Sequence, residues 1–300
     1  MKYQKNLYQA LTYIEHNLDE ELSLDKLSMV ACLSKYHFQR QFSQHFGIST
    51  TVYIKELRLK QAGYQLAFRH EKKVIDIAFE QNYESSEAFS RAFKKCFGIS
   101  PAKFRKSPPW FPWQEKLNLF EILRKTMKEK NTSLKANTKI NVEIVNFPSI
   151  NIAAYEHRRA PYLLGDSIQK FITWRKQHKL SPNVSRTFNL VYDDPITTKP
   201  EDFRFDLCAQ LPSAITVVIE ESLATEAAMR KLVIPAGKCA KVRHIGSDEQ
   251  FGEIIGYLYG EWLANQEVSL RDFPLFFERV SFYPDVSEHE MITDIYLPLV

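Results

Sequence analysis

A block of fourteen residues occurs twice within the first hundred positions of this chain. A shift of 51 residues aligns segment 36–49 with segment 87–100, and seven positions are then identical. The identical pairs are Phe38/Phe89, Arg40/Arg91, Phe42/Phe93, Phe46/Phe97, Gly47/Gly98, Ile48/Ile99 and Ser49/Ser100. A duplication at a fixed period indicates that the same supersecondary unit is built twice.

The spacing inside each copy predicts a helix. Its phenylalanines are four residues apart and share one helix face, and the glycine after the last of them favours a helix end. Arginine and the small polar residues then lie on the opposite face. A short apolar-periodic segment and a tight turn precede each copy, at residues 24–34 and 75–86. This order of helix, short turn and helix is typical of the helix-turn-helix motif, whose second helix fits into the major groove of DNA.

The segment from Thr50 to about Arg69 joins the two copies and is also expected to be helical. About 20 residues at ~1.5 Å each give a rod of roughly 30 Å. Adjacent major-groove faces on one side of B-DNA are separated by ~34 Å. One chain could therefore contact two successive groove segments, a task for which most helix-turn-helix proteins form a dimer.

Residues 7–106, with these two motifs at this separation, resemble the DNA-binding domain of the AraC/XylS family, in particular its Rob, MarA and SoxS group. The resemblance implies that the outward residues of the two recognition helices contact bases. By position these are Tyr36, Gln39, Arg40 and Ser43, then Ser86, Glu87, Ser90 and Arg91. Lys94 and Lys95 are expected to contact phosphate. Members of this group carry tryptophan at the position of Tyr36 and glutamines at the positions of Ser86 and Glu87. Because of the second difference, the second DNA half-site read by this chain need not be the one that those relatives read.

Charge is distributed unevenly along the chain. Residues 1–107 contain 17 Lys and Arg against 11 Asp and Glu, whereas residues 140–300 contain 16 against 22. The basic part is the part that contains the repeats, as expected for a domain that meets phosphates. The four cysteines are far apart, no apolar run is long enough to cross a bilayer, and no secretion signal begins the chain. We therefore expect a cytoplasmic protein with no membrane association, metal or cofactor.

Three segments are predicted from the change in composition. Residues 1–107 form the all-α domain with its two helix-turn-helix motifs and long connecting helix. Residues 108–139 form a proline-rich and then basic linker. Residues 140–300 contain strand, helix, strand, strand twice, which predicts an α+β domain with one antiparallel sheet, helices on one of its faces and a ligand cleft at the pseudo-twofold axis.

The segment 140–300 resembles the GyrI-like effector-binding domain, through Thr293 to Pro298 and through Glu278 in a strand. A carboxylate among apolar neighbours is costly unless it has a partner. From the residues alone, Glu278 can hold a ligand cation, point to solvent, or pair with an arginine such as Arg243 or Arg271. The resemblance implies that Glu278 lines the effector pocket. The other expected pocket residues are Phe276, Tyr155, Trp174, Tyr192, Tyr257 and Trp262.

These features predict a transcriptional regulator and no enzyme. It would bind double-stranded DNA, sense a small lipophilic or amphipathic effector that can be cationic, and contact RNA polymerase. Two alternatives remain for the second domain: it binds a protein partner in place of a small molecule, or it is a GyrI-like hydrolase that uses a glutamate. No nucleophile motif, phosphate-binding loop or metal-binding motif occurs in the sequence.

Overall fold

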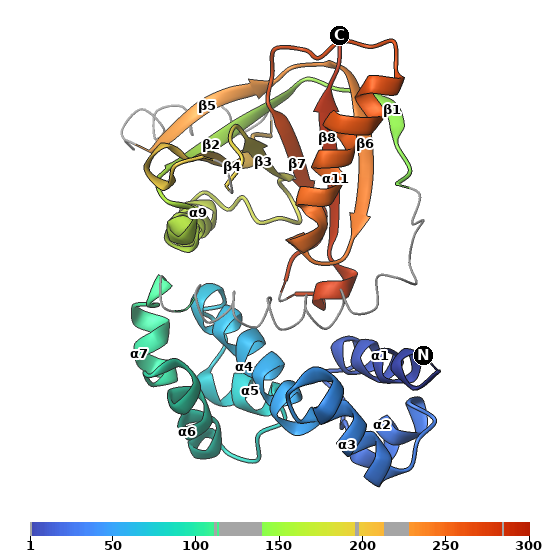
Figure 1. Ribbon diagram of the computed structural model, residues 1–300. Helices are drawn as coiled ribbons and strands as arrows, with labels where there is room; N and C mark the ends of the chain where they lie inside the picture. Colours follow the sequence, from blue (N-terminus) through green and yellow to red (C-terminus); the bar gives the residue numbers. More distant parts are fainter. Residues whose placement is uncertain (1, 111–112, 114–139, 196–197, 213–227, 284) are drawn as a thin grey trace. The chain divides into compact units, whose positions relative to one another are not determined.

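The computed structural model describes residues 2–110, 113, 140–195, 198–212, 228–283 and 285–300. The chain divides into two compact units, Met1–Thr138 and Lys139–Val300 (Figure 1). The first is helical and the second is built on a sheet, as the sequence predicts.

Seven helices make up the described part of the first unit: α1 (Lys2–His16), α2 (Leu24–Val30), α3 (Lys35–Phe46), α4 (Thr50–Phe68), α5 (Val74–Glu80), α6 (Ser86–Phe97) and α7 (Pro101–Lys106). Helices α2 and α3 form the first helix-turn-helix, α5 and α6 form the second, and α4 connects them (Figure 1). The predicted arrangement is confirmed.

The repeated Gly-Ile-Ser ends one helix and begins the next. Gly47 and Gly98 follow α3 and α6 with φ of 72° and 78°, the left-handed conformation that glycine adopts most easily. Two residues later, the hydroxyls of Ser49 and Ser100 accept hydrogen bonds from backbone N–H groups in the first turns of α4 and α7. Each copy therefore fixes the angle at which the chain leaves its recognition helix.

The two helix-turn-helix units differ by one residue in the turn. Helices α2 and α5 start 50 residues apart, whereas α3 and α6 start 51 residues apart. Cys32 and Asn82 occupy the same left-handed position in the turns, with φ of 51° and 56°, so the additional residue follows Asn82. Ser85, the residue before α6, caps this helix and accepts the N–H of Ala88 at 3.1 Å.

The packed core of the first unit extends beyond residue 107, where the sequence predicted a linker to begin. Trp113 is only 4% exposed, and its ring centroid lies 5.1 Å from those of both Phe104 and Tyr64. A Cβ added at Gly63 of α4 would lie 3.2 Å from the indole nitrogen of Trp113. The predicted helix 117–130 and the basic segment 131–139 fall outside the described residues.

The second unit contains one eight-stranded antiparallel sheet, in the order β1-β6-β8-β7-β3-β4-β2-β5. Its strands are β1 (Glu143–Phe147), β2 (Ile150–Arg158), β3 (Thr187–Val191), β4 (Arg204–Gln210), β5 (Met229–Ile234), β6 (Gly237–Ile245), β7 (Leu275–Arg279) and β8 (Ile292–Pro298). The central pair, β3 and β7, lies where the two halves meet. The sequence did not predict strands β1 and β5. Strand β1 of the first half pairs with β6 of the second half, and β5 of the second half pairs with β2 of the first.

The two α-helices in the described part of this unit belong to a single apolar cluster with one face of the sheet. They are α9 (Leu164–Gln177) and α11 (Phe251–Tyr257), and α11 continues into a π-helical turn, Leu258–Trp262. Trp174 and Phe251 pack in that cluster with strand residues such as Phe277. Since neighbouring strand residues point to opposite faces, Phe276 belongs to a second cluster on the opposite face, the helix-free face, which no helix among the described residues covers. The predicted α+β fold with helices on one face is confirmed.

Candidate functional site

Helix α3, the second helix of the first helix-turn-helix, separates its core residues from its polar ones. Phe38, Phe42 and Phe46 are buried, while Tyr36 is 68% exposed and Gln39 and Arg40 are also exposed. Ser43, the fourth predicted contact, is partly exposed on the same helix. The guanidinium of Arg40 lies 3.5 Å from the hydroxyl of Tyr36, one turn earlier. These side chains can reach a groove floor without disturbing the core.

Helix α6 repeats this division. Phe89 and Phe93 are buried, and the remaining predicted contacts lie at the surface: Glu87, Arg91, Lys94 and Lys95 are exposed, and Ser86 and Ser90 are partly exposed. Lys94 and Lys95 are in the last turn, where positive charge also complements the helix dipole.

A groove of about 410 Å³ borders the polar side of α3. Gln39, Arg40 and Ser43 line one part of it, and Ser49, Thr50 and Thr51 at the start of α4 line another. Backbone N–H groups in a first helical turn attract phosphate oxygens. The predicted base contacts therefore lie beside a position suited to the DNA backbone.

In the second unit, Glu278 forms an ion pair with Arg186. The Nε and Nη2 atoms of Arg186 donate to the two carboxylate oxygens, each at 2.6 Å, and the Tyr296 hydroxyl lies 3.3 Å from one of them. The sequence had left open a ligand cation or a structural arginine, with Arg243 or Arg271 as examples. Arg243 instead pairs with Asp294, and Arg271 donates to the carbonyl of Ala236.

Glu278 lies on the helix-free face of the sheet, and the other predicted effector residues do not all share that face. Phe276 is buried on the helix-free face, and Tyr192 packs at the edge of the same cluster. Tyr155, Trp174 and Trp262 belong to the cluster on the helix face. Tyr257 lies on α11 and is half-buried. The sequence pattern could not assign these residues to one face, because the helix aromatics pack into the core.

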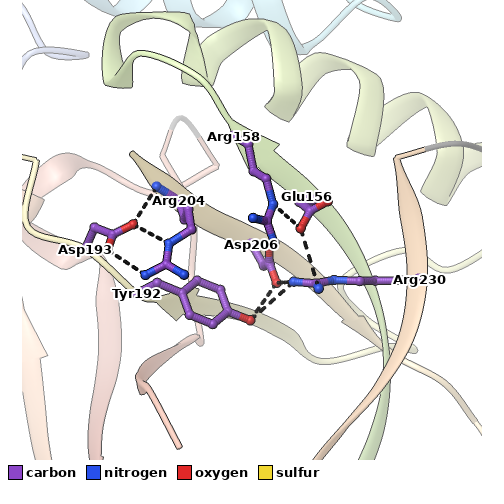
Figure 2. A network of polar contacts seen from close by, with 7 residues as sticks. All are labelled: Glu156, Arg158, Tyr192, Asp193, Arg204, Asp206 and Arg230. Carbon is purple, nitrogen blue, oxygen red and sulfur yellow. Dashed lines mark hydrogen bonds and ion pairs between the residues drawn. The ribbon is translucent and has the colours of Figure 1, made fainter. Parts of the chain in front are cut away.

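A charged network that the sequence reading missed lies around Asp206 of β4 (Figure 2). This carboxylate is 1% exposed and accepts hydrogen bonds from the Tyr192 hydroxyl at 2.9 Å and from Arg230 at 2.7 Å. Burial raises the pKa of Asp206 above its ordinary value, although the two hydrogen bonds oppose that shift. The available signal was an aspartate in the middle of an apolar strand, Phe205-Asp206-Leu207.

Further ion pairs surround this carboxylate (Figure 2). Glu156 of β2 lies 3.5 Å from Arg230 and also pairs with Arg158. Arg204 donates to both oxygens of Asp193, at 2.8 and 2.9 Å, and its guanidinium carbon lies 5.4 Å from the ring centroid of Tyr192. The Tyr192 hydroxyl is therefore engaged by Asp206 and lies 3.4 Å from Arg230, and its ring contacts Arg204.

The part of the chain that the structure describes contains no group of three or more His, Cys, Asp or Glu side chains arranged to hold a metal ion. Among the same residues, no helix combines the length and apolar composition that a membrane span requires.

Comparison with known proteins assigns both units to families. Residues 140–300 match the model of the GyrI-like small molecule binding domain, and residues 27–107 match a helix-turn-helix domain of the AraC type. The probable transcriptional regulator YgiV of Escherichia coli K12 is 35% identical over 164 residues, which is 54% of this chain and 98% of YgiV.

Two relatives resemble the first unit. The right origin-binding protein of Escherichia coli K12 is 38% identical over 100 residues, 33% of this chain and 34% of that protein. The Tn10 TetD protein of Escherichia coli is 35% identical over 101 residues, 34% of this chain and 72% of TetD. The chain thus resembles different relatives in its two halves.

Proposed function

This chain belongs to the GyrI-like small molecule binding domain family and carries an AraC-type helix-turn-helix domain, and from that premise we propose how this DNA-binding regulator works. The first unit reads two adjacent major-groove segments of double-stranded DNA with one chain. The second senses a small lipophilic or amphipathic effector.

The observation that carries the DNA proposal is the equivalence of α3 and α6. Both helices have 12 residues, a serine cap, a left-handed glycine at the end and an exposed arginine at the same position, Arg40 or Arg91. Helix α4, which joins the two helix-turn-helix motifs, has 19 residues, a length of roughly 28 Å at ~1.5 Å per residue. This is comparable with the ~34 Å between successive major-groove faces.

The chemistry of the exposed residues suggests their roles. A guanidinium can donate to N7 and O6 of guanine together, so Arg40 and Arg91 are the proposed base readers. Glu87 can accept a hydrogen bond from cytosine N4. Lys94 and Lys95 would bind phosphate and set affinity more than sequence preference.

Selection of bound fragments from a random DNA pool tests this proposal. We expect a site with two halves about 10 base pairs apart, the repeat of B-DNA. Inserting either 5 or 10 base pairs between the halves should abolish tight binding, because α4 holds α3 and α6 at one spacing. Unchanged affinity after the 10-base-pair insertion would contradict the proposal that one chain reads both half-sites at a fixed spacing. Only two flexibly joined helix-turn-helix motifs could bind half-sites that are one turn further apart.

For the effector, support comes from the family of the second unit and from the combination of Glu278 with aromatic rings. The guanidinium paired with Glu278 lies over the rings of Phe147 and Phe188, so this position suits an organic cation. Calorimetry with a panel of hydrophobic cations should show weaker binding by Glu278→Gln, with DNA binding unchanged. Equal affinities of both proteins for every cation would remove Glu278 from the effector site.

One observation favours a protein partner as the second candidate. Phe147, Phe188 and Phe276 are buried around Glu278, so the helix-free face is filled with side chains at this point. If no small molecule binds the purified protein, a pull-down with the second unit as bait becomes the deciding experiment. A hydrolase would need a glutamate oxygen available to a water molecule, and both oxygens of Glu278 are engaged by Arg186.

RNA polymerase is the remaining proposed partner, and the cytoplasm the proposed location. A regulator bound at a promoter acts on the polymerase recruited there. In vitro transcription from a template with the selected site, with and without the protein, measures the effect and its sign. An unchanged transcript yield would contradict this part of the proposal.

A further inference from the structure

Arg186 occupies the position that a ligand cation would take at Glu278. Its guanidinium donates to both carboxylate oxygens, and its central carbon lies 5.0 Å from the ring centroid of Phe188 and 5.9 Å from that of Phe147. The Glu278 side chain retains an exposed fraction of only 13%. Carboxylate, aromatic rings and cation are all present, with the cation supplied by the protein itself.

The backbone that carries Arg186 is fixed independently of this ion pair. The buried Arg175 of α9 donates to the carbonyls of Leu180 and Ser185 and to the hydroxyl of Thr187, and thereby holds the segment before β3. The carbonyl of Arg186 itself accepts the N–H of Gln210 at 2.9 Å. The Arg186 guanidinium can therefore leave Glu278 by rotation of the Arg186 side chain alone.

The guanidinium of Arg186 would reach solvent after only a short movement. The Arg186 side chain is 40% exposed while paired, so its guanidinium can become hydrated without the sheet opening. Phe147 and Phe188 would remain in place, since they are packed with other members of the cluster on the helix-free face.

We propose that Arg186 is a built-in occupant of the Glu278 site, and that effectors reach this carboxylate by displacing it. This inference rests on the proposed effector-sensing function and goes further in naming the ligand class. The favoured ligand is an amphipathic cation with a planar amidinium or guanidinium head, because such a head reproduces both hydrogen bonds and the contact with ring faces. A quaternary ammonium has no N–H donors and replaces only the charge.

Displacement also sets the affinity of the native protein. A ligand that binds only when Arg186 has left has its apparent affinity reduced by the fraction of molecules in which the site is open. Removing the arginine side chain should therefore strengthen binding. This gain in ligand affinity should require Glu278 and should depend on the head group of the ligand. Hydrophobicity of the ligand alone should not produce it.

Calorimetry on the full chain at pH 8 tests this with two probes of equal tail length, dodecylguanidinium and dodecyltrimethylammonium, below their micelle-forming concentrations. We expect Arg186→Met to bind dodecylguanidinium about tenfold or more tightly than the native protein. The gain for dodecyltrimethylammonium should be smaller. Arg204→Met is the matched control, because Arg204 also pairs with a carboxylate beside an aromatic ring, at Asp193 and Tyr192, and should leave both affinities unchanged.

Two more variants keep the test decisive. Adding Glu278→Gln to Arg186→Met should remove the gain, and a gain that persists in the double variant would overturn the proposal. If Arg186→Met does not fold, Arg186→Lys retains the charge without the planar fork and should bind dodecylguanidinium more tightly than the native protein does. Equal binding of both probes by all variants would refute displacement while leaving effector sensing intact, whereas no binding by any variant would refute both.

Discussion

Asp206 and Asp294 are the third residues of equivalent strands, β4 and β8, and both carboxylates are buried, at 1% and 2% exposure. Their partners differ. Asp206 accepts from one cation, Arg230, and from the neutral hydroxyl of Tyr192. Asp294 contacts two cations, Arg243 at 2.7 Å through both oxygens and Lys241 at 3.0 Å.

This difference gives the two groups opposite pKa shifts. Burial disfavours the ionised form of both, and for Asp206 it prevails and raises the pKa. For Asp294 the hydrogen bonds from Arg243 and Lys241 outweigh burial and lower the pKa. The duplicated fold thus places one carboxylate in a site that favours its charge and the equivalent carboxylate in a site that disfavours it.

Opposite pH dependences should follow for the two Asp→Asn variants. A lowered folded-state pKa means that Asp294 contributes stability above its unfolded pKa of about 3.9, and that this contribution is lost as the pH falls below that value. A raised folded-state pKa means that Asp206 contributes most at low pH, and that its contribution declines as the pH rises from about 3.9 through the folded-state value.

Urea unfolding of the full chain at pH 7 and pH 3 measures this. Asp294→Asn should lower the free energy of unfolding by roughly 1–3 kcal/mol at pH 7, because hydrogen bonds to charged groups are lost, and by less at pH 3. Asp206→Asn should cost less at pH 7 than at pH 3. The same pH trend for both variants would contradict the opposite shifts.

Periodicity explains why the helices and their surfaces could be predicted. The phenylalanines of α3 and α6 recur every four residues, and burial of that stripe decides which residues remain outside. The Gly-Ile-Ser sequence similarly defines a stop and a start locally. Trp113 fell within the predicted linker because of the prolines near it, whereas its burial depends on contacts with α4 and α7 that local sequence does not encode.

The candidate effector site was predicted less well because it depends on distant residues. Arg186 and Glu278 are 92 residues apart and meet only because β3 and β7 are paired, with Phe188 opposite Glu278. Strand alternation predicts that Phe276 and Glu278 share a face, but it does not identify the arginine before the partner strand. Pairing of β1 and β5 with the opposite halves has the same origin, since each strand finds its neighbour across the duplication.

Arg40→Ala and Arg91→Ala should each weaken binding to the selected DNA site by about 1–3 kcal/mol and relax the preference at one position. The reason is the loss of a bidentate contact with a base edge. Fluorescence anisotropy with the selected site and with single-base variants measures both effects. Unchanged affinity and sequence preference for both variants would remove α3 and α6 as base readers.

Lys94→Ala should behave differently from Arg91→Ala on the same helix. A phosphate contact carries no sequence information, so its loss should weaken binding to specific and random DNA by a similar factor. It should also reduce the slope of log K against log salt concentration by about 1. Titrations at four salt concentrations separate the two roles, and Lys95→Ala provides a second variant of the same kind. A changed sequence preference in Lys94→Ala, with the slope unchanged, would reassign Lys94 to base reading.

Trp113→Ala should destabilise the first unit even though the residue lies beyond the helix-turn-helix repeats. The indole is buried against Phe104, Tyr64 and Phe68, so truncation leaves a cavity and should cost about 3–5 kcal/mol. Trp110→Ala, which removes a partly exposed ring from the same segment, is the matched control and should cost less. Urea unfolding followed by far-ultraviolet circular dichroism, which is dominated by the helical unit, measures the difference. Equal small losses for both variants would indicate that the core of this unit ends near residue 107, as the sequence alone suggested.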